Sequence, residues 1–340
     1  MTSIRRGRLY GRKWQILIYK PAYKTNDDGQ EERDPDNDIQ MDVSNLRCIF
    51  KTKADINTYC QLGTLTVYNM NAHTEKEVIE EGFQISIYAG YEEGQYGEIF
   101  TGDIIQIFRN RENGIDYRLE IIAMKGNSTF TANFCRTTLA AGSNPREIPA
   151  VLANQSTKKF DVGTVSEEIP NQPLPRGKVL FGTPAKYLRD ISVWHDAYCW
   201  AGKDDKLEVR TCEQEIPEDN VLVLTPTTGL VGTPVYTDNG INIKMLLEPR
   251  LAPEYMVKID NEIIQRQALN IDVNNKNGQV NQQQVSQQDQ FDKDGEYQIF
   301  SIEHSGDTWG DDWTTTVVGV SRNGRKSLLT AVDSTDQHIR

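Results

Sequence analysis

The sequence has no apolar run approaching the ~20 residues that span a bilayer, and its basic N-terminus lacks the apolar core of a signal peptide. Hydrophobic residues make up only 37% of the 340 residues and the mean hydropathy is −0.58, so we expect modest cores and much loop. The five cysteines are an odd number and lie far apart, which fits free thiols in a reducing cytoplasm. A net charge of −12 argues against a protein that wraps nucleic acid, because phosphate binding needs clustered Lys and Arg.

The most regular stretch of the chain is 97–124, which predicts two long β-strands joined by a tight turn. Apolar residues recur through both arms, and between the arms lies Asn113-Gly114. This dipeptide tolerates the two positive φ angles that a type I′ hairpin turn requires. We therefore predict a long β-hairpin that organises the residues around it.

A second stretch, 297–320, repeats the pattern of the first near the other end of the chain. Its second arm, 312–320, aligns without a gap with 116–124, and acid, aromatic, polar, apolar and small residues fall in the same order. Hairpins resemble one another, so chance is the alternative explanation. We interpret the two stretches as parts of two related β-regions with something else between them.

The remainder of the N-terminal region predicts short strands, which suit a small closed barrel because closure leaves no free edge. Strands are expected at 13–20, 44–53, 63–70 and 82–90, with a helix over 74–81 that Thr74 caps. The acidic stretch 25–38 is expected to be a solvated loop, since it lacks the spacing of a calcium-binding loop.

The middle of the chain changes character and predicts a helical segment, a Pro-rich arm and a small α/β unit. The expected elements are helices at 131–141 and 149–154, an extended arm at 156–175, a strand at 177–181, a helix at 184–198 and strands at 197–200 and 206–211. After it come a strand at 221–224, a hairpin of 231–236 and 241–247 around Asp238-Asn239-Gly240, and a strand at 254–260. The Asn/Gln-rich stretch 274–290 has no core-forming residues and predicts a long loop.

No catalytic, cofactor-binding or metal-binding site rises above background. The sequence contains no nucleophile elbow, P-loop, zinc-protease motif or dinucleotide fingerprint. His195, Cys199 and Cys212 have the chemistry of three metal ligands, but a polar helix end and two small core residues are the preferred interpretation. Glu98 and Asp103 are candidates for a glycosidase carboxylate pair, although acids beside Gly in strands are usually edge or turn residues.

Two further clusters of polar residues are weaker candidates for a functional site. Glu303-His304-Ser305 resembles part of a catalytic triad, but neighbours in a strand point to opposite faces. The basic residues near the N-terminus suit an acidic partner or, equally, a solvated arm; they are Arg5, Arg6, Arg8, Arg12 and Lys13.

The order of these elements, together with several motifs, resembles a known family. The motifs are Ile99-Phe-Thr-Gly-Asp-Ile104, Leu174-Pro-Arg-Gly-Lys-Val-Leu-Phe-Gly182 with Ala185-Lys-Tyr-Leu-Arg-Asp190, Gly229-Leu-Val-Gly-Thr-Pro234 with 241–249 and Val257-Lys-Ile-Asp-Asn261, and Ile302-Glu-His-Ser-Gly-Asp307 with Trp313-Thr-Thr-Thr316. Over roughly residues 10–320 the chain is similar to the central baseplate hub proteins of contractile-tailed bacteriophages. That family is related to the N-terminal half of the VgrG spike proteins of type VI secretion.

The resemblance implies an α+β, mainly β fold with two antiparallel barrels like those of the tail tube. It places the first barrel at 1–125, the helical segment, arm and small α/β domain at 126–222, the second barrel at 223–322 and a polar tail at 323–340. Because the chain ends soon after the second barrel, no fused spike or lysozyme domain is expected.

The implied function is structural, without catalysis or cofactor. Three chains would form a ring of six barrels that joins the six-fold tail tube, or a tube-initiator protein, to the three-fold spike. The ring would sit in the virion after assembly in the host cytoplasm, with baseplate wedge proteins around it, no membrane contact, and DNA only as cargo passing through the bore. The loops 25–38 and 274–290 depart from the family pattern and are candidates for contacts with neighbouring baseplate proteins.

Two other classes of function stay open. One is a tail-associated cell-wall hydrolase that uses an acidic residue. The other is a carbohydrate-binding or receptor-binding β-protein, whose mark would be clustered exposed aromatics. The only tryptophan candidates for such a cluster are the pairs Trp194/Trp200 and Trp309/Trp313, and both pairs are expected to lie in hairpin or helix cores.

Overall fold

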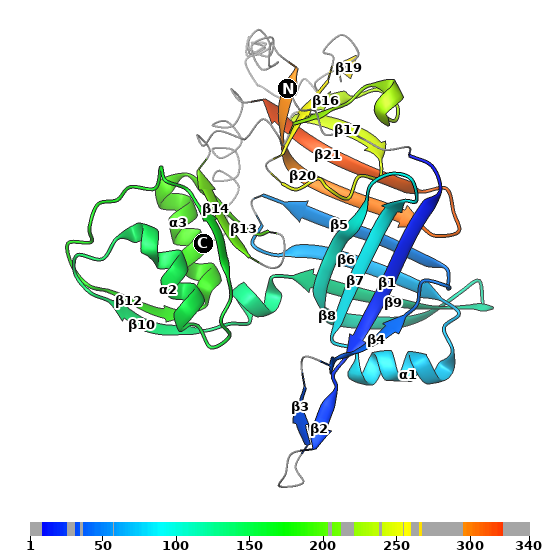
Figure 1. Ribbon diagram of the computed structural model, residues 1–340, viewed down its shortest axis with the longest axis horizontal. Helices are drawn as coiled ribbons and strands as arrows, with labels where there is room; N and C mark the ends of the chain where they lie inside the picture. Colours follow the sequence, from blue (N-terminus) through cyan, green and yellow to red (C-terminus); the bar gives the residue numbers. More distant parts are fainter. Residues whose placement is uncertain are drawn as a thin grey trace, which may run out of the picture.

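The computed structural model describes residues 9–25, 31–34, 37–56, 58–202, 206–211, 221–237, 240–253, 255–259, 265–266 and 295–321. Most of these residues are in strands, so the chain is mainly β, as the sequence predicts. One large sheet has 14 strands along the path β19-β16-β17-β21-β20-β5-β6-β9-β8-β7-β1-β4, with β15 and β18 attached beside β20. The middle of the chain forms a smaller unit at the side of this sheet (Figure 1).

The N-terminal part supplies half of the large sheet. Its strands are β1 (Arg12–Lys20), β4 (Ile39–Asp42), β5 (Cys48–Asp55), β6 (Gln61–Tyr68), β7 (Gln84–Tyr91), β8 (Tyr96–Glu112) and β9 (Asp116–Lys125). In β6 alternate residues are buried, including Leu65 and Val67, because successive side chains of a strand point to opposite faces. The predicted strands and the long hairpin are therefore present within a few residues of their expected bounds.

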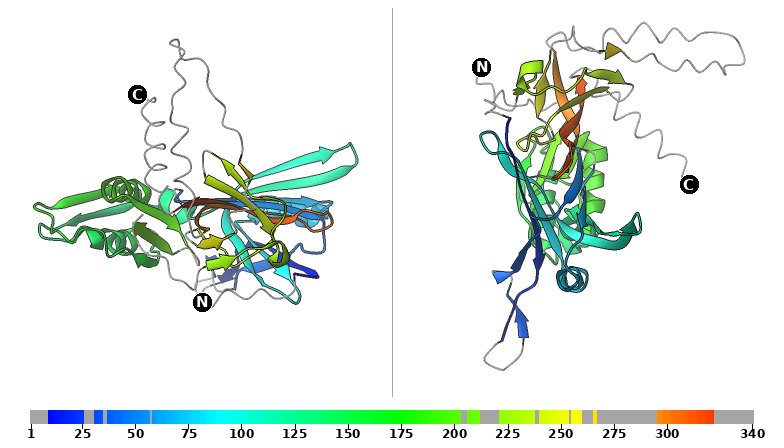
Figure 2. Two further views of the ribbon diagram at one scale, coloured as in Figure 1. Left: turned by 90° about the horizontal axis from the view of Figure 1, so that it is seen from above. Right: turned by 90° about the vertical axis from the view of Figure 1, so that its right-hand side faces the viewer.

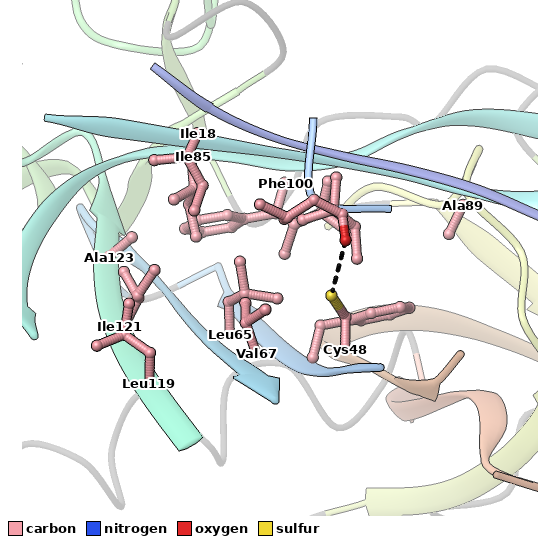
Figure 3. Close-up of a cluster of buried hydrophobic side chains, with 14 of the residues drawn as sticks. Ile18, Cys48, Leu65, Val67, Ile85, Ala89, Phe100, Leu119, Ile121 and Ala123 are labelled. Carbon is pink, nitrogen blue, oxygen red and sulfur yellow. Dashed lines mark hydrogen bonds between the residues drawn. The ribbon is translucent and has the colours of Figure 1, made fainter. Parts of the chain in front are cut away.

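The core of this region lies between two layers of strands. Figure 3 shows Ile18, Ile85, Ala89 and Phe100 on one side facing Leu65, Val67, Ile121 and Cys48 on the other. All of these side chains are almost completely buried. Each of the Ile, Leu, Val and Phe side chains among them stabilises the fold by about 1.5–3 kcal/mol through removal of its apolar surface from water.

The C-terminal part continues the same sheet with shorter strands. They are β15 (Val221–Val223), β16 (Val235–Thr237), β17 (Gly240–Leu246), β18 (Met256–Lys258), β19 (Gln265–Arg266), β20 (Glu296–Asp307) and β21 (Trp313–Ser321). Its core includes Ile241, Ile243, Val257, Tyr297 and Val317. A short 3-10 helix, Pro226–Thr228, forms a turn between β15 and β16.

The two halves have the same strand order. In the first half the order is β5-β6-β9-β8-β7-β1, and in the second it is β16-β17-β21-β20-β18-β15. In chain order, each strand of one series corresponds to a strand of the other. The series differ at the end, because β1 runs antiparallel to β7 whereas β15 runs parallel to β18.

The residue register agrees with this correspondence. In the β8–β9 hairpin, Ile105 is an extra residue between partners of Ala123 and Ile122. In the β20–β21 hairpin, Phe300 is an extra residue between partners of Gly319 and Val318, the positions that align with Ala123 and Ile122. A β-bulge is a specific feature of a strand pair, so its recurrence at the aligned position supports a repeated unit over a chance likeness.

The two halves are joined into one sheet rather than separated. β20 of the second half pairs with β5 of the first, and the path of strands has two ends, β19 and β4. The pairings among the described residues therefore do not close either half into a barrel, and the two-barrel arrangement remains a prediction. The proposed boundaries at 125, 222 and 322 also remain predictions.

The unit between the halves has its own core and two small sheets. It contains β10 (Cys135–Leu139) paired with β12 (Lys178–Gly182), and β11 (Val162–Val165), β14 (Leu207–Thr211) and β13 (Ala197–Ala201) in a second sheet. The helices α2 (Ile148–Gln155) and α3 (Pro184–His195) pack in this core, with Leu152, Leu188 and Ile191 buried. Figure 2 shows the unit standing to one side of the large sheet.

Some predicted elements are wrong. The expected helix at 131–141 is instead a π-helical turn, Asn127–Thr131, followed by strand β10. Cys135 and Leu139, on one face of β10, are buried in the core of the small unit, and β10 pairs with β12, so tertiary pairing overrides the helix-like spacing. The stretch 25–38, expected to be a solvated loop, includes strand β3 (Glu31–Arg33), which pairs with β2 (Tyr23–Thr25) just before it. The arm predicted to be extended contains the short strand β11.

Other local predictions can be compared directly. The helix α1 spans Ala72–Glu81 and ends at Gly82 as expected, but Asn71 caps it rather than Thr74, because the Asn71 side chain accepts a hydrogen bond from the His73 N–H. Asn113 and Gly114 have φ angles of 51° and 75°, which confirms the hairpin turn. The four described cysteines are free thiols. The stretch 274–290, the tail 323–340 and Cys212 lie outside the described residues.

Candidate functional site

The two β-halves meet along β5 and β20. Seven residue pairs join them in antiparallel register, from Ser301 opposite Asp55 to Asp307 opposite Ile49. The ladder continues through a hydrogen bond of 3.0 Å from the Ile56 N–H to the Phe300 carbonyl. Because many backbone hydrogen bonds would have to break to change it, this junction fixes how one half is oriented to the other.

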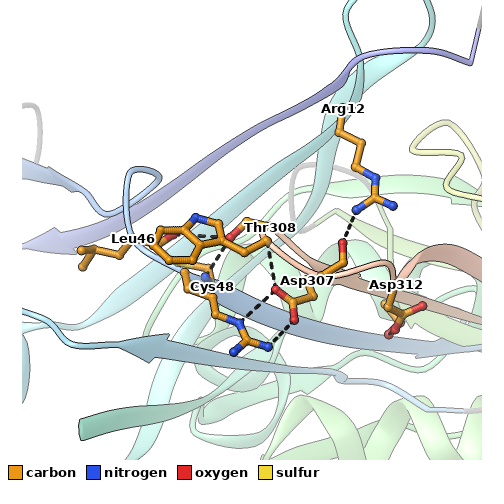
Figure 4. Close-up of polar contacts among 10 residues, drawn as sticks. Arg12, Leu46, Cys48, Asp307, Thr308 and Asp312 are labelled. Carbon is orange, nitrogen blue, oxygen red and sulfur yellow. Dashed lines mark hydrogen bonds and ion pairs between the residues drawn. The ribbon is translucent and has the colours of Figure 1, made fainter. Parts of the chain in front are cut away.

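A polar network closes one end of the junction (Figure 4). Arg47 donates to the Asp307 carboxylate with its Nη2 at 2.7 Å, and the Trp309 N–H donates to the same carboxylate. Thr308 accepts from the Cys48 N–H at 2.9 Å. Burial disfavours ionisation of Asp307, but the hydrogen bonds from Arg47, Trp309 and Gly310 outweigh it, so the pKa of Asp307 is lowered.

Arg12 extends this network to the start of the chain. Its guanidinium donates to the Gly310 carbonyl at 2.5 Å and to the Asp311 carbonyl at 2.9 Å. The same guanidinium lies over the ring of Trp313, 5.5 Å from the centroid, which is a cation–π geometry. Within the N-terminal basic cluster, Arg12 therefore binds within its own chain, and Lys13 lies over the Tyr96 ring. Arg5, Arg6 and Arg8 lie outside the described residues.

Aromatic rings fill the interior beside the network. Trp313 packs edge-on against Phe50, with 5.5 Å between ring centroids, and its indole N–H donates to the Gly90 carbonyl at 3.3 Å. Gly306 leaves room for Phe50, since a Cβ at this position would lie 2.3 Å from the Phe50 ring. Trp313 is part of β21 in the second half, but its side chain packs in the core of the first half. It therefore holds the two halves together.

A buried histidine lies on the same strand. His304 is opposite Thr52 of β5 and Thr315 of β21, and its Nδ1 is 2.8 Å from the Thr315 hydroxyl. Burial lowers the pKa of His304 to about 4, against a smaller opposing effect of Glu248, so the ring is neutral at physiological pH. The adjacent Glu303 lies 2.9 Å from Lys51 instead, and Ser305 bonds to Asp312. This supports the expectation that these three neighbours do not form a triad.

The small unit is anchored on the bulge residue of the junction. Phe300 packs against the buried cluster of Ile56, Tyr198 and Trp200. The Gln61 side-chain amide donates to the Ala201 carbonyl at 2.7 Å. One end of β5, the start of β6 and strand β13 are therefore held together at a single place.

Two exposed apolar surfaces lie away from the junction. The β8–β9 hairpin exposes Ile105 at its bulge, Phe108 farther along β8 and Ile115 in the turn, the last with 80% of its surface accessible. On the small unit an aromatic patch is defined by Phe134, Val179 and Phe181, the last two on the face of β12 opposite the buried Leu180, whereas Val193 and Trp194 are exposed on α3. Exposed apolar side chains that gather on one surface are typical of binding sites. In the patch, Phe134 and Phe181 stack edge-on with 5.0 Å between ring centroids; outside it, Lys178 lies over the Trp194 ring.

In each tryptophan pair predicted to lie in a core, one ring is buried and the other is exposed. Trp200 and Trp313 are 2% exposed, whereas Trp194 is 63% and Trp309 is 71% exposed. Trp194 is in the last turn of α3, on the same side of the helix as the buried Tyr187 and Ile191, and Trp309 is in the β20–β21 turn. The prediction is therefore wrong for one member of each pair.

The candidate carboxylate pair is not assembled as a glycosidase site. Glu98 and Asp103 are on one strand, opposite Tyr88 and Gln84, and five positions along a strand span about 16 Å. Glycosidase carboxylates face each other across about 5–9.5 Å. Asp103 instead accepts a hydrogen bond from the Ser128 N–H at 3.3 Å.

The candidate metal ligands have ordinary structural partners. Burial raises the pKa of Cys199 to about 12, and its thiol accepts from Ser192 and donates to the Leu188 carbonyl. His195 is half-buried at the end of α3, where burial and Lys178 lower its pKa. Within the described ranges, no group of three His, Cys, Asp or Glu residues could hold a metal ion. Cys212 is outside these ranges, so the absence of a metal site stays a prediction.

The junction was not visible in the sequence as a site. Arg47, Asp307 and Thr308 have no motif that links positions about 260 residues apart, and only the strand pairing brings them together.

Among the described helices, none has both the length and the apolar character needed to cross a bilayer.

Comparison with known proteins identifies a family. A family model described as baseplate hub gp41 matches residues 59–287, more than half of the chain. No curated protein sequence matches the chain.

Solved structures with the same fold come from tail proteins and a secretion system. The 43 kDa tail protein of prophage MuSo2 from Shewanella oneidensis is 9% identical, with a TM-score of 0.55 and coverage of 92% of this chain and 98% of that chain. A tail protein from Neisseria meningitidis MC58 is 10% identical, with a TM-score of 0.52 and coverage of 93% and 98%.

The third structure is the E. coli c3393 protein, a type VI secretion component described as structurally similar to the T4 tail proteins gp27 and gp5. It is 9% identical, with a TM-score of 0.51 and coverage of 82% of this chain and 74% of that chain. At these identities the likeness is one of fold, and it extends over both β-halves and the unit between them.

Proposed function

We propose, from the premise that this chain belongs to the baseplate hub gp41 family, that three copies form a pseudo-six-fold ring at the centre of a contractile tail baseplate. Membership of this family confirms the resemblance to phage baseplate hubs and gives the chain a structural role in the tail baseplate of the virion. In the proposal the ring joins the six-fold tail tube, or a tube-initiator protein, to the three-fold spike. Wedge proteins of the baseplate surround it.

The repeated strand order is the observation that supports the proposed ring. Two halves with one order, β5-β6-β9-β8-β7-β1 and β16-β17-β21-β20-β18-β15, give three chains six similar segments. A chain with two such segments is suited to a place where six-fold symmetry meets three-fold symmetry. The β5–β20 ladder and Trp313 support this role, because they hold the two segments of a chain at one angle.

Composition supports the burial of surface between chains. A hydrophobic share of 37% is low for a protein that must fold alone, and the β8–β9 hairpin exposes apolar side chains at its end. Obligate interfaces commonly bury more than about 2,000 Å². We therefore expect the isolated chain to be less stable than the ring.

The bore of such a ring would let DNA pass without binding it. The chain has 49 acidic and 37 basic residues, so an acidic lining would repel phosphates at short range. A reconstruction of the ring with a neutral or basic bore would contradict this part of the proposal.

Native mass spectrometry of the purified full-length chain tests the proposal. We expect a trimer near three times 38.6 kDa, and two-dimensional class averages of the same sample with six similar lobes around a hole. A chain that stays monomeric at all concentrations from 1 to about 50 μM, bracketing the range of ordinary obligate interfaces, would contradict it.

The exposed aromatic patch on the small unit favours a second candidate function, the binding of a carbohydrate or a receptor. Clustered exposed aromatics are the feature that this alternative requires, and Phe134 and Phe181 form such a pair. A glycan array probed with the wild type and with Phe181→Ser tests this function. Tyr10→Ser, which alters an exposed aromatic elsewhere, is the matched control. Binding that only Phe181→Ser abolishes would favour the alternative, and no binding would contradict it.

A further inference from the structure

The distal half of β8 has a backbone edge that no strand covers. β8 pairs with β7 over Tyr96–Asp103 and with β9 over Asp103–Glu112. From Gln106 to Glu112, the edge away from β9 has no strand partner among the residues that the structure describes. The hairpin projects here beyond the rest of the sheet (Figure 2). Helix α1 contacts this half through a side-chain pair, Glu75 with Arg109 at 2.6 Å, and not through backbone pairing.

The corresponding half of β20 is covered. When the bulges at Ile105 and Phe300 are superimposed, Gln106–Glu112 corresponds to Ser301–Asp307. The segment Ser301–Asp307 is the part of β20 that pairs with β5. The same edge is therefore paired in the second half of the chain and open in the first half.

The strand that covers the edge also has a counterpart. β5 forms a hairpin with β6, and β16 forms the corresponding hairpin with β17. The partners of β9 and β21 set the register: Leu65 is opposite Ile121, and Ile243 is opposite the aligned Val317. By this register, Lys51 of β5 corresponds to Val235 of β16, since Lys51 is opposite Thr64 and Val235 is opposite Asn242.

We infer that the open edge of β8, Gln106–Glu112, pairs in the assembled ring with β16 of a neighbouring copy, in the way that Ser301–Asp307 pairs with β5 within one chain. In this register Asn110, the counterpart of Ser305, lies opposite Val235 of the neighbour. The inference rests on the proposed ring and names the surfaces through which it closes. The contact is head-to-tail, because the first half of one copy meets the second half of the next.

The neighbour's strand already pairs with one short strand, which this pairing would displace. Among the described residues, the outer edge of β16 pairs with β19, two residues that lie opposite Val235 and Tyr236. The β5–β20 ladder spans seven residue pairs, so a ladder of the same length would form more backbone hydrogen bonds than β19 supplies. An exposed strand edge otherwise invites uncontrolled association, which a defined partner strand prevents. Ile105 and Phe108, exposed beside the edge, would be covered at the same time.

Site-specific photocrosslinking tests the inference. The photoreactive residue benzoylphenylalanine is placed at Asn110, and the assembled protein is irradiated as a mixture of ¹⁵N-labelled and unlabelled chains. We expect crosslinks between labelled and unlabelled chains that map to residues 230–246 of the partner. The control, with the same residue at the exposed Lys76 of α1, should give no crosslink to this segment.

Native mass spectrometry of each sample distinguishes failure of the inferred strand pairing from failure of the proposed ring. A trimer whose Asn110 crosslinks are absent, or map elsewhere, would overturn the inference while leaving the ring intact. A monomer would overturn the ring and the inference together.

Discussion

The indole ring of Trp313 lies edge-on to that of Trp14, with 5.9 Å between the ring centroids. One residue belongs to the last described strand and the other to the first long strand. Trp313 is 2% exposed and also packs on Phe50, so its burial closes the core where the two β-halves meet. The following predictions test how far this junction controls the stability of the chain.

Replacing Trp313 with alanine should remove a large part of the stability. Truncation of a buried Trp costs about 3–5 kcal/mol, because apolar contacts are lost and a cavity is left. Urea unfolding followed by circular dichroism measures the free energy of unfolding. Trp309→Ala is the matched control, since Trp309 is 71% exposed and should change this free energy by less than about 0.5 kcal/mol. Equal losses for both variants would show that Trp313 does not lock the halves.

Adding a methyl group at Gly306 should strain the junction. The new Cβ would lie 2.3 Å from the Phe50 ring, so we expect Gly306→Ala to lower the free energy of unfolding by about 1–3 kcal/mol. The control is Gly97→Ala in β8, where the nearest atom is 3.9 Å away. The double variant Gly306→Ala/Phe50→Leu should lose less unfolding free energy than the sum of the two single losses. Fully additive losses would mean that these two residues do not clash.

Removing the guanidinium of Arg47 should destabilise the fold most at neutral pH. Asp307 would keep its buried carboxylate without its main partner, which costs about 1–3 kcal/mol. Because the folded-state pKa of Asp307 is lowered, its contribution is present above the ordinary Asp pKa and is lost as pH falls through the folded pKa. The difference in unfolding free energy between wild type and Arg47→Met should therefore shrink in acid. Lys76→Met, which removes an exposed pair with Glu80, should change little at any pH.

His304 should make the fold sensitive to mild acid. Its pKa is about 4 in the folded chain against an ordinary 6.5, so the unfolded chain takes up a proton first as pH falls. Stability should thus fall between pH 6.5 and 4, by an amount on the order of a few kcal/mol. His304→Gln should lack this component of the pH dependence in urea-unfolding curves, whereas His73→Gln, on the exposed surface of α1, should retain it. An unchanged slope in His304→Gln would contradict the assignment.

The sequence by itself determined the local elements of this protein. Two-residue alternation marked the strands, and Asn113-Gly114 fixed the turn of the long hairpin, because both signals depend on neighbours along the chain. The likeness of 116–124 to 312–320 also anticipated the repeated strand order. The order of the elements, together with several motifs, was enough to indicate a resemblance to the family.

Only the tertiary structure decided which strand edges meet. Residues 131–141 carry helix-like spacing, yet β12 offered a partner and the segment became β10. Trp309 and Trp313 are four residues apart, and packing buries one and exposes the other. The pairing of β5 with β20, and with it the meeting of Arg47 and Asp307, joins residues about 260 positions apart. Such contacts depend on which edges remain free after the local hairpins have formed, and no short-range pattern encodes that outcome.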